Sequence, residues 1–294
     1  KIAKNTSCMA NRLLAAGGIL LGKTKTVEFA FGGWGTNQKM GTPRNPWDKN
    51  SFRVCGGSSS GSAAALAANL TVCATGTDTG GSVRLPASFC GVTGLKVTKG
   101  ILSTKGITPL SHTLDTPGPM ARSLEDLIIM FEVLKGNPGY EIDKKIKKKC
   151  GFFNDLIKGI SGLRIGSIDD KDRSQCSSNV LYLYDKTLKI LESHGAIIKQ
   201  FKSPIDYLDI SKQTGDIISI EAYSYHGHLY EDDNNLMDDN VKKRILNAKN
   251  FSSLQYQKLL TDRNKNEKIF IDSILDFDAL VTPTTTHEAS LIAD

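Results

Sequence analysis

The sequence lacks the features that mark several classes of protein. Among its 294 residues no apolar run approaches the roughly 18 that a membrane-spanning helix needs, so we expect no membrane association. The start of the chain shows no secretory signal pattern. The six cysteines include no C-x-x-C pair, and their spacing does not match a disulfide scaffold. A reducing compartment, the cytoplasm, is therefore the expected location.

Signals for binding phosphate or nucleic acid are also scarce. The chain has no G-x-x-x-x-G-K-[ST] loop of the kind that holds nucleotide phosphates. The net charge is +6, and much of it comes from the basic run at residues 144–149. Such a run is typical of a solvated loop or helix face, so we expect no direct contact with nucleic acid.

Two glycine-serine turns dominate the first third of the chain. Residues 56–62 read GGSSSGS and residues 79–82 read TGGS, with an alanine-rich helix pattern and a short apolar run between them. Glycine permits backbone geometries that other residues resist, so a serine behind two glycines is easily exposed. We predict Ser82 as a nucleophile, with neighbouring N–H groups as an oxyanion site. These N–H groups belong to Thr79, Gly80, Gly81 and Ser82. Ser58 can fold back onto Ser82, because one helix and one strand separate them.

Two other interpretations of the first turn compete with this one. A glycine-serine run is often a flexible linker, but here it is followed by TDTGGSVRLPASFC between apolar segments. Residues 57–61 also fit G-x-S-x-G, the nucleophile elbow of α/β-hydrolases, which follows a strand and precedes a helix. A helix pattern does follow, but residues 52–55 make only a thin strand, and the second turn would then have no role.

Histidines offer the main competing chemistry. Two candidate sets could serve a Ser-His-Asp triad: His112 or His287 as the base, with Asp115 or Asp278 as its partner. We expect both histidines to be ordinary surface or loop residues. His226-Gly227-His228 could supply two metal ligands, but no third ligand stands at a suitable spacing. The sequence therefore predicts neither a metal nor an organic cofactor.

The two turns together resemble a known signature. GGSSSGSAAALAA at 56–68, followed by GTDTGGSVRLPASFCGVTGLKVT at 76–98, is similar to the motif of the amidase signature family of serine hydrolases. The resemblance implies a catalytic set of Ser, cis-Ser and Lys. Ser82 would be the acylated serine, and Ser58 the serine that follows a cis peptide bond and relays the proton. Residues 79–82 match the oxyanion segment, and three residues match positions that brace the loops: Asp78, Arg84 and Ser59.

The resemblance also implies an α/β fold. We expect a single large domain over residues 1–294, with a mixed, twisted β-sheet flanked by α-helices on both faces, and a possible peripheral excursion at 137–160. Apolar patterns predict strands at 19–21, 70–74, 162–168, 196–201 and 277–286. They predict helices from residue 9 to Gly17-Gly18, at 60–69, from 124 to Gly136, at 180–194, and over most of 216–276.

Candidate substrate-binding residues follow from the same resemblance. The family has a loop before the glycine-serine turn that lines the substrate cleft, and it carries a similar strand and Pro-Thr turn beside the pocket. We therefore expect four residues to contact the substrate: Phe31, Trp34, Asn37 and Thr284. Trp34 could equally be an ordinary core residue.

The catalytic lysine of the family is not found in this chain. In the family it lies in an apolar strand followed by Asp, well upstream of the cis-Ser turn. Lys1 and Lys4 lie in KIAKNTS, which resembles the segment just after that strand, and Lys23 and Lys25 match a non-catalytic position. The chain also stops soon after the Pro-Thr turn, where the family usually continues. We expect an incomplete sequence rather than an enzyme that has lost its base.

The resemblance implies an amidohydrolase that cleaves a linear carboxamide or ureide through a seryl acyl-enzyme and releases ammonia or an amine. EFAFGGWGTN at 28–37 looks closer to small-amide or ureide hydrolases than to the glutaminase subunit of aminoacyl-tRNA amidotransferases, which frees ammonia from glutamine. That glutaminase, with partner subunits, is one alternative. A non-catalytic binding protein without the lysine is another. A small amide is the expected partner, and a stand-alone amidase is expected as a monomer or homodimer.

Overall fold

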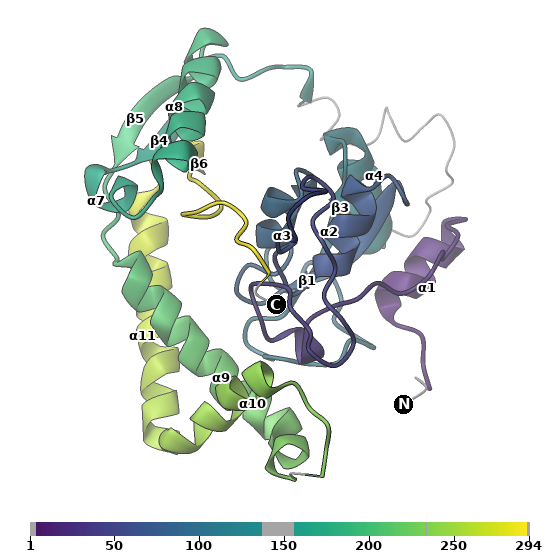
Figure 1. Cartoon of the computed structure of the whole chain (residues 1–294). Coiled ribbons are helices and arrows are strands. Elements are labelled where there is room, and N and C mark those ends of the chain that lie inside the picture. The colour runs from purple at the N-terminus through teal and green to yellow at the C-terminus, as the bar shows by residue number, and fades with distance from the viewer. Residues whose placement is uncertain (1–3, 137–155, 233, 293–294) are drawn as a thin grey trace. The chain divides into compact units, whose positions relative to one another are not determined.

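The computed structural model describes residues 4–136, 156–232 and 234–292 (Figure 1). The predicted excursion at 137–160 lies outside the described residues as far as residue 155. Within the described residues, no helix has both the length and the apolar character needed to cross a membrane.

The chain forms two compact units. The first unit contains Lys1–Lys149, Ile218–Phe251 and Ala289–Asp294, and the second contains Cys150–Ile217 and Ser252–Glu288. Both predicted glycine-serine turns belong to the first unit. Whether the chain is a single domain, as the sequence predicts, stays a prediction.

The first unit is built on a three-stranded antiparallel sheet in the order β1-β3-β2. Its strands are β1 (Cys73–Asp78), β2 (Thr93–Gly94) and β3 (Thr116–Ala121). β3 is central and wholly buried, although proline is unusual in a central strand because it has no N–H to donate. Pro117 and Pro119 are two residues apart and so take the same kind of register position, opposite Thr77 and Thr75. The intervening Gly118 keeps an N–H for the ladder.

Two of the predicted strands are wrong: one is displaced along the chain and the other is absent. The apolar run at 70–74 is not the strand; β1 begins at Cys73, and Leu70 and Val72 are exposed. Pairing with β3 and close packing select the later segment instead, because Gly76 admits Ser59 and Val83 to its surface. The predicted strand at 19–21 is absent, and its side chains are exposed. No strand in the described part of the chain pairs with it.

Four helices accompany this sheet, and the apolar patterns predict all of them except the one at 84–89. They are α1 (Cys8–Ala15), α2 (Ser60–Ala67), α3 (Arg84–Phe89) and α4 (Leu124–Lys135). α4 begins at Ser123, whose hydroxyl accepts a hydrogen bond from the Asp126 N–H, and it ends at Gly136 in the left-handed conformation. Small residues of α2 let that helix pack against β1 and β3 (Figure 1). One buried cluster joins α2, α3 and the sheet: Cys55, Ala63, Leu66, Val83, Ala87, Cys90 and Met120.

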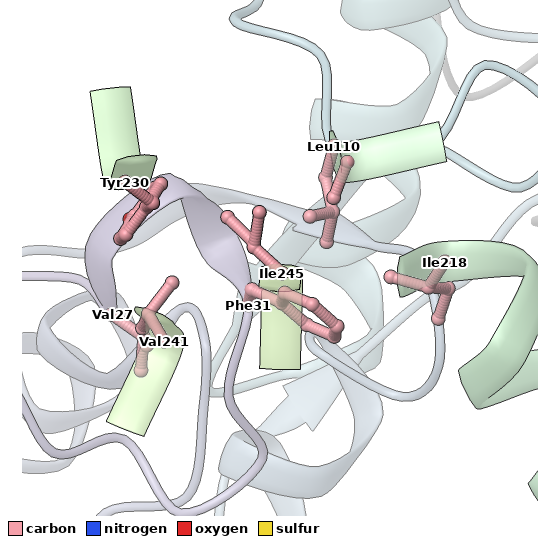
Figure 2. Close-up of a cluster of buried hydrophobic side chains, with 8 residues drawn as sticks. Val27, Phe31, Leu110, Ile218, Tyr230, Val241 and Ile245 are labelled. Carbon is pink, nitrogen blue, oxygen red and sulfur yellow. The ribbon is translucent and has the colours of Figure 1, made fainter. Parts of the chain in front are cut away.

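A second buried cluster in this unit joins segments that are far apart in the sequence (Figure 2). It involves the short 3-10 helix η1 (Glu28–Ala30), the end of α9 (Tyr207–Glu231) and α10 (Asp239–Leu246), which leads into η2 (Asn247–Asn250). The buried side chains are Val27, Phe31, Leu110, Ile218, Ala222, Tyr230, Val241 and Ile245. The cluster therefore fastens the segment that precedes the first glycine-serine turn onto two distant helices.

The second unit holds a parallel three-stranded sheet in the order β5-β4-β6. Its elements are β4 (Arg164–Ile168), α7 (Asp170–Arg173), α8 (Ser178–Ser193), β5 (Ile197–Phe201), the long α11 (Ser253–Ser273) and β6 (Ala279–Val281). The predicted strand-helix-strand order over 162–201 is confirmed. Tyr184 of α8 is buried, and its hydroxyl accepts a hydrogen bond from the Ile168 N–H and donates one to the Val281 carbonyl.

Candidate active site

The first glycine-serine turn connects a buried segment to α2. The peptide bond between Gly57 and Ser58 is cis, and Ser58 is almost completely buried. The N–H of Val27 donates to the Ser58 carbonyl at 3.3 Å, and the N–H of Gly57 donates to the Gly33 carbonyl. A Cβ atom on Gly57 would lie 2.6 Å from the Gly35 nitrogen, so only glycine fits against this loop. The turn is therefore held in place by the glycine-rich segment before it.

The second turn joins β1 to α3 and is organised by the Asp78 carboxylate. Oδ1 accepts hydrogen bonds from the Gly81 N–H at 2.8 Å and from the Arg84 guanidinium at 2.9 Å. Oδ2 accepts from the Val83 N–H at 3.1 Å and from Arg84 Nε at 3.0 Å. A single buried side chain thus closes the whole loop that carries Ser82. These contacts support the predicted bracing role of Asp78 and Arg84.

The charge of Asp78 is stabilised despite its burial. Burial alone would raise the pKa of this carboxyl, because a charged group loses hydration inside a protein. The hydrogen bonds and positive charge of Arg84, together with backbone N–H groups, outweigh this effect and hold the pKa below its usual value. Asp78 is therefore ionised at neutral pH and remains an acceptor for the turn.

The two turns meet through their backbones. The N–H of Ser59, next to Ser58, donates to the Ser82 carbonyl at 3.2 Å. The Ser59 hydroxyl accepts from the Thr77 N–H at 3.2 Å and donates to the Thr77 carbonyl at 3.4 Å. Because the Ser59 hydroxyl is engaged with β1, the G-x-S-x-G elbow, which would use Ser59 as the nucleophile, is wrong for this chain. The hydrogen bond between Ser59 and Ser82 instead brings the turn that carries Ser58 against the turn that carries Ser82.

The predicted oxyanion donors differ in their engagement. The Gly81 N–H is used by Asp78, which takes it out of the predicted set in this conformation. The N–H groups of Thr79, Gly80 and Ser82 donate to no protein acceptor in the part of the chain that the structure describes. Ser82 is 9% exposed. Three donors on one short turn are therefore open to an incoming oxygen.

Asp115, which sequence reasoning considered only as a partner for a histidine, supports this turn. Its Oδ1 accepts a hydrogen bond from the Thr79 hydroxyl at 2.7 Å, and its Oδ2 accepts from the N–H groups of Leu110 and Ser111. An aspartate at the end of a turn-rich segment gave no specific signal, because its contact with Thr79 depends on how β1 and β3 pair.

Neither of the two alternative histidine triads forms. The Asp115 carboxylate accepts a hydrogen bond from the Thr79 hydroxyl. The His112 side chain is mostly exposed, and its Nε2 lies 3.4 Å from Glu221 Oε1. In the second unit Asp278 is paired with Arg164, and the His287 ring is hydrogen-bonded to Thr286. The Ser-His-Asp alternative is therefore wrong for both sets.

The surroundings of His226 indicate a structural role. It is buried, stacks on Phe29 with ring centroids 4.0 Å apart, and shares a hydrogen bond with the Pro109 carbonyl. Burial lowers its pKa, so the ring is neutral at pH 7. Among the described residues no group of three or more His, Cys, Asp or Glu side chains is placed to hold a metal ion.

A pocket of about 340 Å³ lies beside the glycine-rich segment that precedes the first turn, and its lining includes no residue of either glycine-serine turn. Two predicted substrate residues, Phe31 and Trp34, line it, and so does Val27, which is hydrogen-bonded to Ser58. The other lining residues are Gly32, Thr36, Asp238, Asn240, Val241, Lys243 and Arg244. The pocket therefore combines an aromatic wall with charged groups from α10.

Asn37 and Thr284 do not share that pocket. Asn37 is buried, and its carboxamide is used within its own loop: it donates to the Thr26 carbonyl and accepts from the N–H groups of Lys39 and Met40. The structure thus gives Asn37 a role within its own loop, and its contact with substrate stays a prediction. Thr284 follows β6 in the second unit, and its role stays a prediction.

Comparison with known proteins decides the family. A profile of the Amidase family matches residues 1–294. The A-subunit of a glutamyl-tRNA(Gln) amidotransferase from Alkaliphilus metalliredigens is 31% identical over 94% of this chain and 61% of its own length. The chain belongs to the amidase signature family. It spans about three fifths of the length of that relative.

Solved structures of amidase signature enzymes have the same fold. A crystal structure described as an amidase superposes with a TM-score of 0.87 at 26% identity, over 100% of this chain and 63% of its own. The A-subunit of the glutamyl-tRNA(Gln) amidotransferase from Thermotoga maritima gives a TM-score of 0.78 at 28% identity, over 98% of this chain and 63% of its own. The predicted α/β amidase signature fold is confirmed.

No lysine of the described residues takes the place of the family's catalytic lysine at these two serines. In the described ranges, no lysine amino group is hydrogen-bonded to Ser58 or Ser82. Lys25 contacts the first turn, but through its carbonyl, which accepts from the Gly61 N–H. Lys1 lies outside the described residues. The prediction that these lysines are not the catalytic base is consistent with this geometry.

Proposed function

We propose that this chain carries the nucleophilic centre of an amidase that cleaves the C–N bond of a linear amide at Ser82. The contact between Ser59 and Ser82 is the observation that carries the proposal, since it holds two serine-bearing turns together beside three open backbone donors. This arrangement suits acyl transfer, which needs a hydroxyl nucleophile and hydrogen-bond donors at the oxygen that becomes negative.

The proposed steps conserve atoms and charge. Ser82 Oγ bonds to the carbonyl carbon, and its proton passes through the Ser58 hydroxyl to a general base. The N–H groups of Thr79, Gly80 and Ser82 stabilise the oxyanion. The C–N bond then breaks as the base returns the proton to the leaving nitrogen, so that ammonia or an amine departs. Water hydrolyses the acyl-enzyme, which releases the carboxylic acid and restores Ser82.

The pocket beside the segment that precedes the first turn supports a small substrate. At about 340 Å³ it lies at the lower end of ordinary ligand pockets, and Phe31 and Trp34 supply an apolar wall. A small carboxamide or ureide fits this volume, and Val27, which lines the pocket, is hydrogen-bonded to the Ser58 carbonyl. No cofactor takes part in the proposed steps.

Substitution of each serine tests the proposal. We expect Ser82→Ala to reduce amide turnover at least about a thousand-fold, since no acyl-enzyme can form. Ser58→Ala should leave a small remainder, because general acid–base catalysis contributes roughly 10²–10⁴-fold. The matched control is Ser88→Ala, an exposed serine on α3. Ammonia release would be measured for all three variants, and wild-type rates in both active-site variants would reject the assignment.

A glutaminase subunit is the second candidate, because the relative from Alkaliphilus metalliredigens is named as the A-subunit of an amidotransferase. Lys243 and Arg244 at the pocket also offer positive charge for a carboxylate-bearing amide such as glutamine. A glutaminase subunit would copurify with partner chains and show little activity alone. A stand-alone amidase would be active as a monomer or homodimer on small neutral amides. Tight binding of a small amide without turnover or Ser82 acylation would indicate a binding protein.

A further inference from the structure

Asn45 makes a set of contacts that the proposed mechanism does not use. Its side chain is buried in the loop before the first glycine-serine turn. The Nδ2 group donates to two carbonyls, that of Val54 at 3.2 Å and that of Phe89 at 2.7 Å, while Oδ1 accepts from the Trp47 N–H at 3.1 Å. The N–H of Asn45 itself donates to the Arg53 carbonyl at 3.0 Å. One carboxamide thus connects three separate stretches of backbone.

The orientation of this carboxamide follows from its partners. Carbonyl oxygens only accept hydrogen bonds, so the two that face Asn45 require its NH₂ group. The Trp47 N–H only donates, so it requires the oxygen. A rotated amide would set oxygen against two carbonyls and nitrogen against an N–H. The contacts therefore identify Nδ2 as the donor to the two carbonyls and Oδ1 as the acceptor from the Trp47 N–H.

The two tied carbonyls lie on the elements that carry the two serines. Val54 stands two residues before Gly56, where the Ser58 turn begins, and Phe89 is the last residue of α3, which begins two residues after Ser82. We propose that Asn45 is a positioning residue that sets the spacing between the Ser58 turn and the helix that follows Ser82. This inference rests on the proposed amidase function, and it assigns Asn45 no contact with substrate.

The surroundings of Asn45 make the bridge specific. Cys55 and Cys90 flank the tied carbonyls and are fully buried, and the Cys90 thiol donates to the Cys55 carbonyl at 3.5 Å. The Trp47 indole Nε1 donates to the Cys90 carbonyl at 2.7 Å. Water therefore has little access to replace the Asn45 donors, and a carbonyl left without its partner there is costly.

The first test uses the charge of an aspartate. In Asn45→Asp a carboxylate would face two carbonyl oxygens, whereas the protonated acid could donate to one of them. We expect kcat to fall roughly 10- to 100-fold at neutral pH, with KM changed less than about twofold because the pocket beside the segment that precedes the first turn does not include Asn45. Part of kcat should return as the pH falls toward 5. Asn45→Ala should lower kcat without that recovery.

The matched control is Asn50→Asp, an exposed asparagine of the same loop. It introduces the same charge into the same loop, whose charged residues are Arg44, Asp48, Lys49 and Arg53, but at a side chain that has no hydrogen bond to a carbonyl in the described part of the chain. We expect its kcat, KM and pH profile to equal those of the wild type. If Asn45→Asp and Asn50→Asp have equal kcat values at every pH, the inference is overturned.

The second test needs no activity. Cys55 and Cys90 are buried beside the bridge, so their alkylation by iodoacetamide, followed by mass spectrometry, reports opening of this junction. Cys8 and Cys176, which are partly exposed, serve as internal references. In Asn45→Ala and Asn45→Asp we expect both buried thiols to react at least about tenfold faster, with the references unchanged.

The two tests separate the two claims. If wild-type protein shows neither amide turnover nor acylation of Ser82, the proposed function fails, while the thiol rates still support or overturn the bridge. If the wild type is active and the Asn45 variants lower only the melting temperature, with kcat and thiol rates unchanged while the protein is folded, Asn45 is not a positioning residue.

Discussion

At the scale of single residues, Asp78 does the most to shape the candidate site. One carboxylate orders the turn after β1 by accepting from two backbone N–H groups and from Arg84. The same contacts leave Thr79, Gly80 and Ser82 as the proposed oxyanion donors, since the Gly81 N–H donates to Asp78. The buried carboxylate of Asp78, paired with Arg84, thus maintains the shape of the turn.

This charge predicts how stability depends on pH. The folded state holds the pKa of Asp78 below the ordinary value of 3.8, so the stabilising contribution is complete above about pH 4 and is lost as the pH falls toward the folded-state pKa. Asp78→Asn should be less stable at pH 7 by about 2 kcal/mol, a moderate figure because water partly screens the half-exposed Arg84. The variant should also lose less stability between pH 5 and pH 3 than the wild type.

Urea denaturation at several pH values measures both effects. Asp48→Asn is a useful control, because its carboxylate is also paired with an arginine but lies outside the turn. Equal acid sensitivity in wild type and Asp78→Asn would contradict this account of the turn.

At the scale of elements, most helices were predictable from the sequence, although α3 was not, and the strands were less so. The helix at 60–69 and the strand-helix-strand order at 162–201 were found because their patterns are local. The strand β1 was misplaced because its residues, CATGTD, are chosen by pairing with β3 and by the approach of Ser59 to Gly76, neither of which apolar periodicity records.

The site residues divide in the same way, into those that a local motif identifies and those whose partners are distant in the sequence. The motif identified the turns that carry Ser58 and Ser82, because glycine and serine at those spacings have a direct geometric meaning. It did not reveal Asp115 or Asn45, whose partners are distant backbone groups, and it assigned Asn37 to the substrate although its carboxamide is used by its own loop.

Close packing between the first turn and the loop before it can be tested at Gly57. A Cβ atom there would lie 2.6 Å from the Gly32 carbonyl oxygen and 2.7 Å from the Gly35 Cα, and both are backbone atoms that cannot rotate away. Gly57→Ala should therefore destabilise the protein by about 3 kcal/mol and reduce acylation of Ser82. Gly22→Ala is the control, since no atom lies within 4 Å of its Cβ. Thermal unfolding compares the two, and equal stability would contradict the packing described.

At the scale of the whole molecule, the candidate catalytic residues and the parallel sheet belong to different units. The first unit holds both serine turns and the pocket, and the second holds β4, β5 and β6. Each unit has its own buried contacts. In the second, the Tyr184 hydroxyl joins β4 to β6 through two hydrogen bonds.

Loss of that hydroxyl should affect the second unit selectively. Tyr184→Phe leaves a buried N–H and a carbonyl without their partner, which costs about 1–2 kcal/mol. Native-state hydrogen exchange should show faster exchange in β4 and β6, with β1 and β3 unchanged. Tyr182→Phe, an exposed tyrosine of α8, should change neither unit. Equal loss of protection in both sheets would show that the units do not respond separately.

The central claim is that Ser82 is the nucleophile at the meeting point of the two turns. The most direct measurement is reaction with a fluorophosphonate probe, followed by peptide mass spectrometry to locate the modified residue. The account predicts a single adduct on Ser82, strongly slowed by Ser58→Ala and unaffected by Ser88→Ala. An adduct on another residue, or amide turnover by a protein whose Ser82 stays unmodified under saturating probe, would contradict it.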